Sequence, residues 1–359
     1  MNLVENIKIT PIFDTLRLQK ISDAEYFSER YSDYISNSRL GFIDPNNGGS
    51  PEKFLAGFKG NRIFSDSLSL GSVVHEQTLQ PELFSLCPDL NRPTAKVGFI
   101  ADEIASMRKG GKLKDFTKEE FYKACSVVDY YKGEPKESKI KEILPAIKEY
   151  LANLEVFLQS KPNVSTYLDS KTLDKAKGCI SALKNNRKVQ SLLHPTGLLE
   201  TPISECEQAI LLDAVVKCPD LPEFTIRLKS KLDNYTIDKE SNVITVNDVK
   251  TIGRTLNNSD EQVLKYHYYR EMSMYCYLLS LCAKQFYGLP EKFKVRSNFL
   301  WVSTVPPTGN YTTYATKVTP MTPELFKLGS DEFKDLLRRA SVALYFKDAV
   351  QVEEYFQSL

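Results

Sequence analysis

The sequence FTIRLKSKLDNYTIDKESNVITVNDVKT, residues 224–251, decides the fold that this chain can adopt. Its first half alternates between two kinds of side chain, which is the pattern of a strand with one buried face. Phe224, Ile226, Leu228 and Leu232 point one way, and Arg227, Lys229, Lys231 and Asp233 point the other. A polar, turn-like segment at 238–241 then leads to a second β-branched run at 243–250. Two such runs joined by a short polar link predict an antiparallel hairpin.

The predicted hairpin gathers charged side chains on one face. With the turn centred on residues 239–240, Asp233 faces Val246, Asp248 is its diagonal neighbour, and Lys250 shares the same face. Opposed and diagonal partners lie roughly 5–8 Å apart, so two carboxylates and a lysine converge. Carboxylates this close repel each other unless a cation neutralises them, and a divalent cation with oxygen ligands would do so.

A lysine beside such a cation can hold or deprotonate an attacking water, which is the layout for metal-assisted phosphodiester hydrolysis. The alternative interpretation is an ordinary hairpin whose solvent face carries mixed charges. The rest of the chain has to decide between the two.

Length and composition limit the number of domains and the class of protein. The 359 residues suffice for one large domain with insertions or for two domains. A hydrophobic content of 42% and a charged content of 26% are ordinary for a soluble globular protein. The net charge is +1, so bulk charge does not indicate a nucleic-acid partner, and any DNA contact must come from local basic clusters.

The cysteine pattern and the chain start suggest a compartment. None of the seven cysteines forms a C-x-x-C pair, which predicts reduced, mostly buried thiols and no zinc or iron–sulfur site. Charged residues interrupt the N-terminus before an apolar core develops, so we expect no signal peptide. The longest apolar run, around 275–283, is too short to span a bilayer. These features predict a cytoplasmic protein with no membrane partner.

The N-terminal third contains two recognisable segments after an irregular, partly helical lead-in at 1–34. In the first segment, Ser36 and Ser38 are candidate helix caps, a loop occupies 44–51, and a helix begins at Pro51. In the second segment, a helix lies within 68–84 and ends before Pro81. Its predicted apolar face consists of Leu70, Val73, Val74, Gln77 and Leu79, with His75 in the middle of the helix. A lone helical histidine of this kind is either a satisfied core residue or a ligand.

Residues 101–200 have a mostly helical pattern. The basic, glycine-containing loop at 108–114 could contact phosphate or could be an ordinary solvated loop. A helix runs on from Ile140, with Pro145 either kinking it or marking its start, and another helix covers 173–193. The His194-Pro-Thr-Gly197 segment then breaks the chain. We interpret this region as a helical insertion without chemistry of its own.

The C-terminal part supplies the remaining elements. Glu207 begins a first core strand at 207–216, and one long aromatic-rich helix covers 260–284. Two strands follow within 298–318 around a Pro-Pro turn, and one or two helices at 321–346 close the chain. The whole predicts an α/β (α+β) protein with a central mixed sheet flanked by helices.

The order of these elements resembles the core of the PD-(D/E)xK nuclease superfamily, in which a strand, a hairpin with D…D-x-K and a helix follow one another. The flanking segments resemble those of the phage-type exodeoxyribonuclease VIII (RecE-like) group. These segments follow the order found in that group: S-N-S-R-L with S-P-E-K-F, then L-G-S-V-V-H-E-Q-T-L-Q-P-E-L-F, and later F-L-W-V-S-T-V-P-P. The resemblance covers about residues 34–346 and is loose in the helical middle.

The resemblance implies a restriction-endonuclease-like core and a Mg²⁺- or Mn²⁺-dependent deoxyribonuclease. It implies metal binding by Asp233 and Asp248, with His75 and Val249 as further ligands. Lys250 would activate water or stabilise the transition state. Glu207 matches an acidic residue of the group, and a structural salt bridge is an equal alternative for it.

One helix departs from the resemblance. The group usually carries a glutamine four residues before a tyrosine, whereas this chain has Glu271 before Tyr275, which we include among the candidate catalytic residues. Neighbours on a helix do not face each other, so Lys250 or the metal, rather than Arg270, is expected to offset the charge of Glu271. The cysteine cluster that some relatives use for an iron–sulfur centre is absent.

The resemblance favours an exonuclease of phage recombination or DNA processing, acting in a bacterial cell or a phage-infected host. An endonuclease on the same core and a catalytically silent DNA-binding scaffold are the alternatives. Expected partners are DNA, above all double-stranded ends, a recombinase or single-strand-binding protein, and a second copy of the chain. We expect an N-terminal helical segment with the His motif at 1–100, a helical insertion at 101–200 and the nuclease core at 201–359, all in one compact unit.

Overall fold

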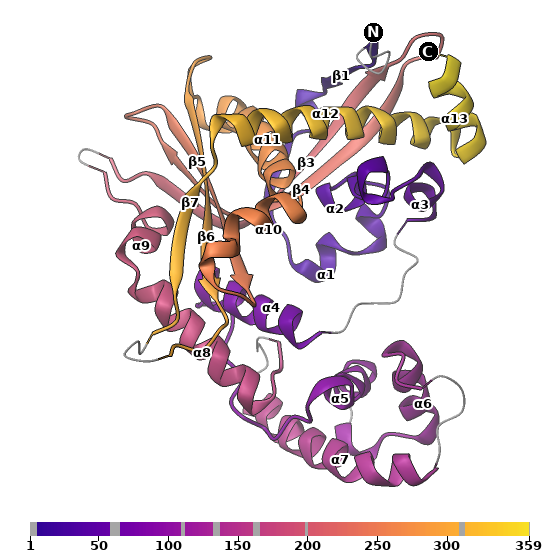
Figure 1. Ribbon diagram of the computed structural model, residues 1–359, viewed down its shortest axis with the longest axis vertical. Helices are drawn as coiled ribbons and strands as arrows, with labels where there is room; N and C mark the ends of the chain where they lie inside the picture. The colour runs from indigo at the N-terminus through magenta and orange to yellow at the C-terminus, as the bar shows by residue number, and fades with distance from the viewer. Residues whose placement is uncertain are drawn as a thin grey trace.

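A mixed β-sheet runs through the computed structural model of the chain (Figure 1). The structure describes residues 6–57, 65–108, 112–131, 137–160, 166–197, 200–308 and 313–358. Within these residues seven strands form the sheet in the order β1-β3-β4-β5-β6-β7, and β2 also pairs with β3. The β5–β6 pair is parallel and the other pairs are antiparallel. The sheet and its flanking helices confirm the predicted fold class.

The strands are β1 (Lys8–Pro11), β2 (Arg17–Lys20), β3 (Ile203–Lys217), β4 (Phe224–Asp238), β5 (Val243–Ile252), β6 (Lys294–Ser303) and β7 (Thr316–Pro320). The helices before β3 are α1 (Asp23–Tyr26), α2 (Asn37–Leu40), α3 (Pro51–Ala56), α4 (Asp66–Leu79), α5 (Ala95–Met107), α6 (Lys118–Val127), α7 (Glu137–Ser160), α8 (Ser170–Asn185) and α9 (Arg187–Leu193). Those after β5 are α10 (Ser259–Lys265), α11 (Tyr268–Tyr287), α12 (Pro323–Phe346) and α13 (Ala349–Ser358).

The β4–β5 hairpin forms as predicted, but its register differs from the prediction. Tyr235, and not Asp233, lies opposite Val246, and the ladder closes with Asp238 opposite Val243. The reason is the turn, in which the Asp238 carboxylate accepts hydrogen bonds from the backbone N–H, at 3.1 Å, and the hydroxyl of Ser241. The turn is therefore centred one residue later, and continuing the register brings Asp233 level with Asp248 rather than diagonal to it.

The alternation in β4 shifts at Asp233. Core residues of β4 are even-numbered up to Leu232 but odd-numbered from Tyr235 onward. The shift lies opposite Glu207, which has a φ of 56° in the middle of β3 and interrupts the β3–β4 pairing between Cys206 and Gln208. Glu207 was expected to begin the strand; β3 in fact begins at Ile203. A non-glycine residue with positive φ inside a strand turns the following side chains to the other face.

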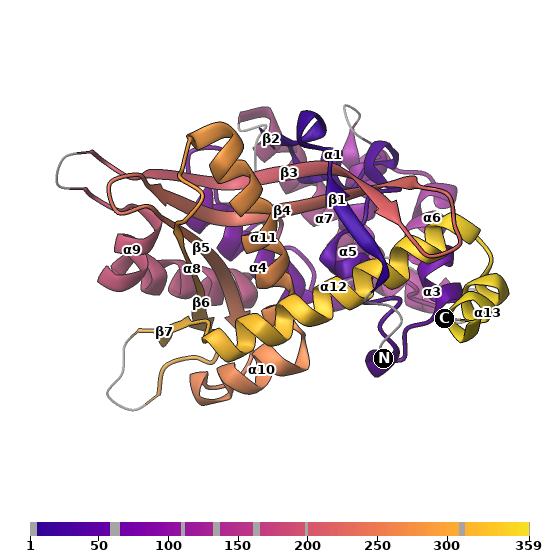
Figure 2. The same ribbon diagram turned by 90° about the horizontal axis from the view of Figure 1, so that it is seen from above.

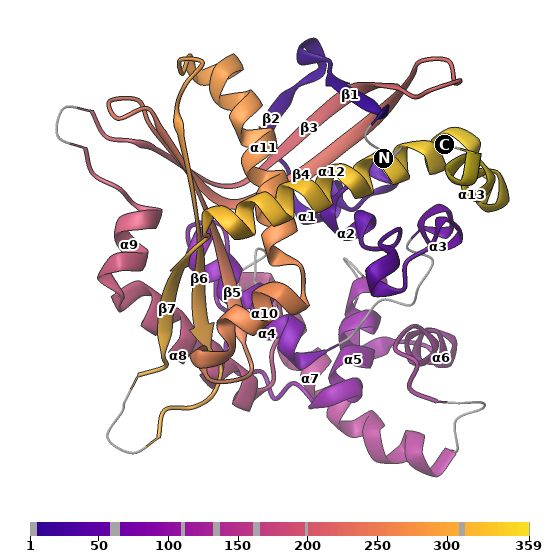
Figure 3. The ribbon, with the colours of Figure 1, turned by 45° about the horizontal axis from the view of Figure 1, so that its top comes forward.

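Two hydrophobic cores cover opposite faces of the sheet. The larger core joins the sheet to α11 and α12, which Figure 2 shows running over it. The second core joins α4, α8 and α9 to Val249, Leu300 and Val302 of β5 and β6. Figure 3 shows α8 and α9 on the side of β6 and β7 away from α12. Because Val249 points into the second core, its neighbours Asp248 and Lys250 point toward α11.

The helical region predicted as an insertion at 101–200 is divided between two cores. Its later helices, α8 and α9, belong to the second core. The helices α5, α6 and α7, which we call the insertion, form a third core, whose buried members lie between Phe99 and Leu154 and include Val128 just after α6. Figure 1 shows these helices as a lobe beside the sheet. Pro145 lies inside α7, so it neither starts nor ends that helix.

Several N-terminal predictions are confirmed and two are wrong. Ser36 caps α2, and α3 begins at Pro51 as predicted. The predicted apolar face of α4 is buried throughout. Ser38 lies inside α2 and is not a cap. The lead-in was expected to be irregular and partly helical, but it contains β1 and β2, whose pairing with the distant β3 gives no local sequence signal.

Two predicted helices are each divided in the structure. The helix expected at 173–193 is α8 followed by α9, separated by Asn186, whose side-chain oxygen accepts from the N–H groups of Lys188 and Val189. The helix expected at 260–284 is α10 followed by α11, with His267 between them at a φ of 54°. The two strands expected within 298–318 are β6 and β7, shifted by a few residues.

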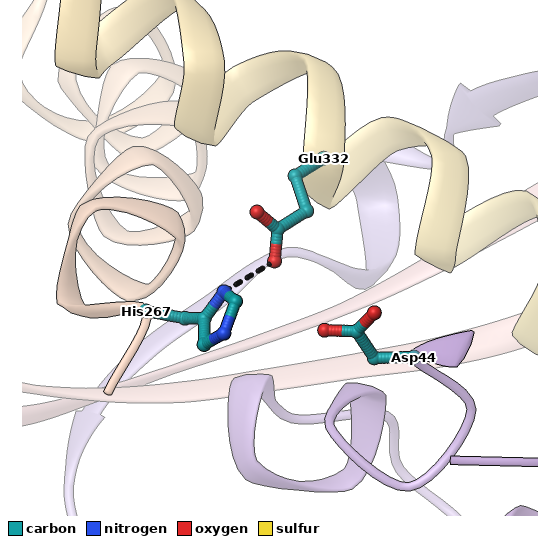
Figure 4. A group of neighbouring side chains, drawn as sticks. All are labelled: Asp44, His267 and Glu332. Carbon is teal, nitrogen blue, oxygen red and sulfur yellow. Dashed lines mark hydrogen bonds and ion pairs between the residues drawn. The ribbon is translucent and has the colours of Figure 1, made fainter. Parts of the chain in front are cut away.

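The break before α11 is held by polar contacts around His267 and Arg270, some of which Figure 4 shows. His267 Nδ1 lies 2.9 Å from Glu332 Oε1 on α12, and His267 Nε2 lies 2.6 Å from Asn47 Nδ2. Arg270 in the first turn of α11 donates to Asp44 Oδ2 at 3.1 Å and to Glu332 Oε1 at 2.7 Å. These contacts fix the start of α11 against the N-terminal segment and α12.

We predict that Arg270→Ala lowers the free energy of unfolding by about 3–5 kcal/mol, because it leaves the Asp44 carboxylate buried without its counter-charge. Asp44 is 0% exposed and Arg270 is 4% exposed. The matched control is Arg30→Ala, since the Arg30 side chain is 71% exposed in its ion pair with Glu25. The control should change stability by less than about 1 kcal/mol. Equal effects of the two variants in urea denaturation would contradict the prediction.

Candidate active site

A largely buried lysine, whose side chain is 16% exposed, lies at the centre of the candidate site. Lys250 Nζ lies 3.0 Å from Asp248 Oδ2 and 3.1 Å from Glu271 Oε2. It also lies over the ring of Tyr268, 4.5 Å from its centroid, where a cation is attracted by the aromatic face. Tyr275 donates its hydroxyl hydrogen to Glu271 Oε1 at 3.0 Å. The side chain of Lys250, at the end of β5, is therefore held from β5 itself and from α11.

The second half of the site forms around Asp233. Its Oδ2 accepts a hydrogen bond from the Val249 backbone N–H at 2.8 Å and lies 3.4 Å from His75 Nδ1 on α4. Ligand atoms of His75, Glu207 and Asp233 lie within 4.8 Å of one another. Glu207 also forms an ion pair with Lys231 at 2.7 Å, so the salt bridge and the clustering with Asp233 occur together.

Burial makes this group of charges costly. Burial raises the pKa of the Asp233 and Asp248 carboxyl groups, although the nearby Lys250 ammonium acts in the opposite direction. Burial opposes the charge on Lys250 as well, but the carboxylates of Asp248, Glu271 and Asp233 outweigh it and raise the pKa of Lys250. Burial, and then the Lys250 charge, lowers the pKa of His75, which favours the neutral imidazole.

The donor set fits a divalent cation. Asp248 Oδ2 is buried and, apart from its 3.0 Å ion contact with Lys250, accepts no hydrogen bond of favourable geometry from the described residues. Asp233, Glu207 and the neutral His75 offer carboxylate oxygen and imidazole nitrogen in a group of their own, and the charges of Asp248 and Asp233 act on each other. Carboxylates with an imidazole suit Mg²⁺ or Mn²⁺. Val249 could add only its backbone carbonyl.

A second group of potential ligands fits a metal poorly. Asp44, His267 and Glu332 also offer ligand atoms within 4.8 Å of one another (Figure 4). The guanidinium of Arg270, however, already contacts both carboxylates, at 3.1 Å and 2.7 Å. A fixed positive charge at that place repels a cation, so this group serves as an ion-pair network.

The structure brings the predicted site residues together. Asp233, Asp248, Lys250, Glu271, Tyr275, His75, Glu207 and Val249 all lie within the contacts described above. Glu271 contacts Lys250, while Arg270 points to a different set of partners. Residues 109–111 of the basic loop predicted at 108–114 lie outside the described residues.

Sequence reasoning missed two members of the site. Tyr268 lies within the aromatic-rich helix predicted at 260–284 and was not singled out there, because its contact with Lys250 depends on the break at His267. Lys231 was counted as a solvent-facing residue, but it is 14% exposed and bound between Glu207 and Asp23. The interruption at Glu207 and the chain segment carrying Asp23 create that environment, and neither has a sequence signal.

A solved structure resembles the chain at low sequence identity. No protein-family model matches the chain, and no curated protein matches it. A crystal structure from Eubacterium rectale named "Putative exonuclease" is 11% identical and has a TM-score of 0.45. That similarity covers 90% of this chain and 86% of the other chain. No described helix is both long and apolar enough to cross a bilayer.

We predict that Asp248→Asn stabilises the metal-free protein at neutral pH. The folded-state pKa of Asp248 lies above its ordinary value, so the folded protein holds this proton more tightly than the unfolded chain does. Between the two pKa values the unfolded chain releases this proton and the folded protein keeps it, so the wild-type protein loses stability as the pH rises from about 4 to neutral. In EDTA the variant should be more stable by about 1–3 kcal/mol at pH 7.5, with a smaller advantage at lower pH.

The control is Asp115→Asn, because Asp115 is exposed. It should leave the pH dependence of stability unchanged. A less stable Asp248→Asn variant at pH 7.5 would show that the Lys250–Asp248 pair outweighs the cost of burial.

Proposed function

We propose that this chain is a Mg²⁺- or Mn²⁺-dependent deoxyribonuclease with a PD-(D/E)xK core. The observation that carries the proposal is the buried Asp248 carboxylate, whose Oδ2 contacts Lys250 at 3.0 Å next to the His75–Glu207–Asp233 group. Buried carboxylates with one lysine and no second fixed cation in contact with Asp248 among the described residues favour an added divalent ion. The sequence resemblance supports DNA as the substrate.

Asp233, Asp248 and His75 would hold the metal, with Glu207 and the Val249 carbonyl as further donors. When bound, the metal supplies positive charge for the phosphate and lowers the pKa of a bound water. Lys250 contributes a fixed ammonium, which Asp248, Glu271 and the Tyr268 ring hold in place. A preorganised charge of this kind stabilises the negative charge that develops at the phosphate in the transition state.

Glu271 occupies the place where the resembled group has a glutamine. A carboxylate can only accept hydrogen bonds, and here it accepts from Lys250 and from Tyr275. Glu271 thus orients the ammonium group of Lys250, and its own negative charge is offset by that group. This contact explains how the chain accommodates an anion beside a site that must approach DNA.

We propose further that the chain acts as an exonuclease, which degrades double-stranded DNA from its ends during recombination or DNA processing. Its support is the sequence resemblance. On the same basis we propose that its partners are a recombinase or single-strand-binding protein and a second copy of the chain. We also propose that it acts in the cytoplasm.

The test uses linear and covalently closed circular duplex DNA, with Mg²⁺, with Mn²⁺ or with EDTA. We expect the linear form to be degraded in either metal and the circular form to survive. Lys250→Met should lower the rate about a thousandfold, as expected for loss of a preorganised charge. Lys334→Met, an exposed lysine on α12, is the matched control and should keep the wild-type rate.

Cleavage of the circular form would replace the exonuclease with an endonuclease on the same site. Unchanged degradation by Lys250→Met would show that the site is assigned wrongly. If folded wild-type protein degrades neither form of DNA, a silent DNA-binding scaffold is the better interpretation.

A further inference from the structure

A hollow of about 470 Å³ lies in the helical insertion, between the start of α6 and the first half of α7. The insertion has its own hydrophobic core, and none of the hollow's lining residues belongs to the candidate active site. The hollow is therefore separate from the proposed nuclease centre. Its volume lies within the range of pockets that bind compact ligands.

The hollow has an apolar floor. Phe116, Tyr122, Ile140 and Leu144 are partly buried members of the insertion core that also line the hollow. Aliphatic and aromatic groups contribute to the floor together. A floor of this kind accepts bulky apolar side chains, because it gains free energy when water is displaced from it.

The rim of the hollow is positive. Lys118, Lys141 and Lys148 are exposed and line it, whereas Glu137 is the one acidic residue among the described lining residues. Lys118 Nζ lies 5.5 Å from the centroid of the Tyr122 ring, so this ammonium stands directly over the floor. The rim thus has a local excess of two positive charges, and its complement is an anionic ligand.

The aromatic rings of the floor distinguish between two kinds of anionic polymer. Sites for single-stranded nucleic acid offer free aromatic faces in succession along a basic groove. Here Phe116 stacks on Phe121 at 6.4 Å, and Phe121 meets Tyr122 edge to face at 6.0 Å, so the rings contact each other. Ile140 and Leu144 complete the floor with aliphatic surface, on which a base gains little by stacking. The floor favours a peptide.

We propose that this hollow docks an acidic segment of a partner protein. One or two bulky apolar side chains of the segment lie on the Tyr122–Leu144 floor, and its carboxylates contact Lys118, Lys141 and Lys148. The insertion then serves to recruit the chain to a partner. This role does not depend on the proposed nuclease activity.

The test measures binding of fluorescent peptides to the full-length protein in EDTA by polarisation. The panel consists of decapeptides in which four Asp or Glu residues precede two positions varied among Leu, Ile, Phe and Trp. We expect at least one peptide to bind with a Kd below about 100 µM. Replacing its two apolar residues by serine should abolish binding, and added salt should weaken it.

Paired variants locate the binding. Lys141→Glu with Lys148→Glu should weaken the Kd at least about fivefold, since each places a like charge against the peptide. The control is Lys123→Glu with Lys139→Glu. These two lysines are exposed on α6 and α7, the helices that form the hollow, but they do not line it. Leu144→Ala should weaken binding without changing charge, and circular dichroism should show that every variant is folded.

Three results would overturn the proposal: no member of the panel binds, both charge-reversed pairs lose binding equally, or Leu144→Ala binds as well as the wild type. A twenty-nucleotide oligo-dT provides the other comparison. If the oligonucleotide binds, if Lys141→Glu with Lys148→Glu weakens it, and if no peptide competes with it, the hollow is a nucleic-acid site.

Discussion

The contact between the buried Asp248 carboxylate and the Lys250 ammonium is the interaction on which the rest of the site depends. Removing both charges from water is expensive, and their attraction repays this cost only when further partners satisfy them. Lys250 finds those partners in Glu271 and the Tyr268 ring on α11. Beyond its contact with Lys250, the buried Oδ2 atom of Asp248 has no further partner among the described residues, which favours an additional positive charge beside it. We propose that a divalent cation supplies this charge.

Two departures from regular backbone geometry bring the site residues together. Glu207 has a φ of 56° inside β3 and lies opposite Asp233, where the alternation of β4 shifts. His267 has a φ of 54° between α10 and α11, and this break places Tyr268 over Lys250. Such backbone conformations cost about 1–3 kcal/mol each and persist where the surroundings impose them. Here the surroundings are the Lys231 ion pair at Glu207 and the Asn47 and Glu332 contacts at His267.

Sequence patterns predicted most of the elements because those patterns are local. The β-branched runs predicted the hairpin, Pro51 predicted the start of α3, and the apolar spacing predicted α4. The hairpin register was missed because it depends on side-chain hydrogen bonds inside the turn, from Ser241 to Asp238. β1 and β2 were missed because they pair with a strand roughly two hundred residues away.

The candidate residues were predictable to the extent that D…D-x-K, the histidine helix and the Glu271–Tyr275 spacing are visible in the sequence. Their partners were not, because Tyr268, Lys231 and Asp23 enter the site through a helix break, an interrupted strand and the N-terminal segment. The insertion illustrates the same limit. A mostly helical region and a helix from Ile140 were predicted there, but α5 and α6 were not predicted individually. The hollow between α6 and α7 arises only when these helices pack together.

Metal binding beside Asp248 is tested most directly by the anomalous diffraction of crystals of this protein soaked in Mn²⁺. We expect an anomalous peak between Asp233, Asp248 and His75, about 2–2.5 Å from the ligand atoms of these side chains. The peak should vanish in crystals of folded Asp248→Asn protein. A peak at Asp44, His267 and Glu332 instead, or no ordered Mn²⁺ beside Asp248 at millimolar concentration, would contradict the account.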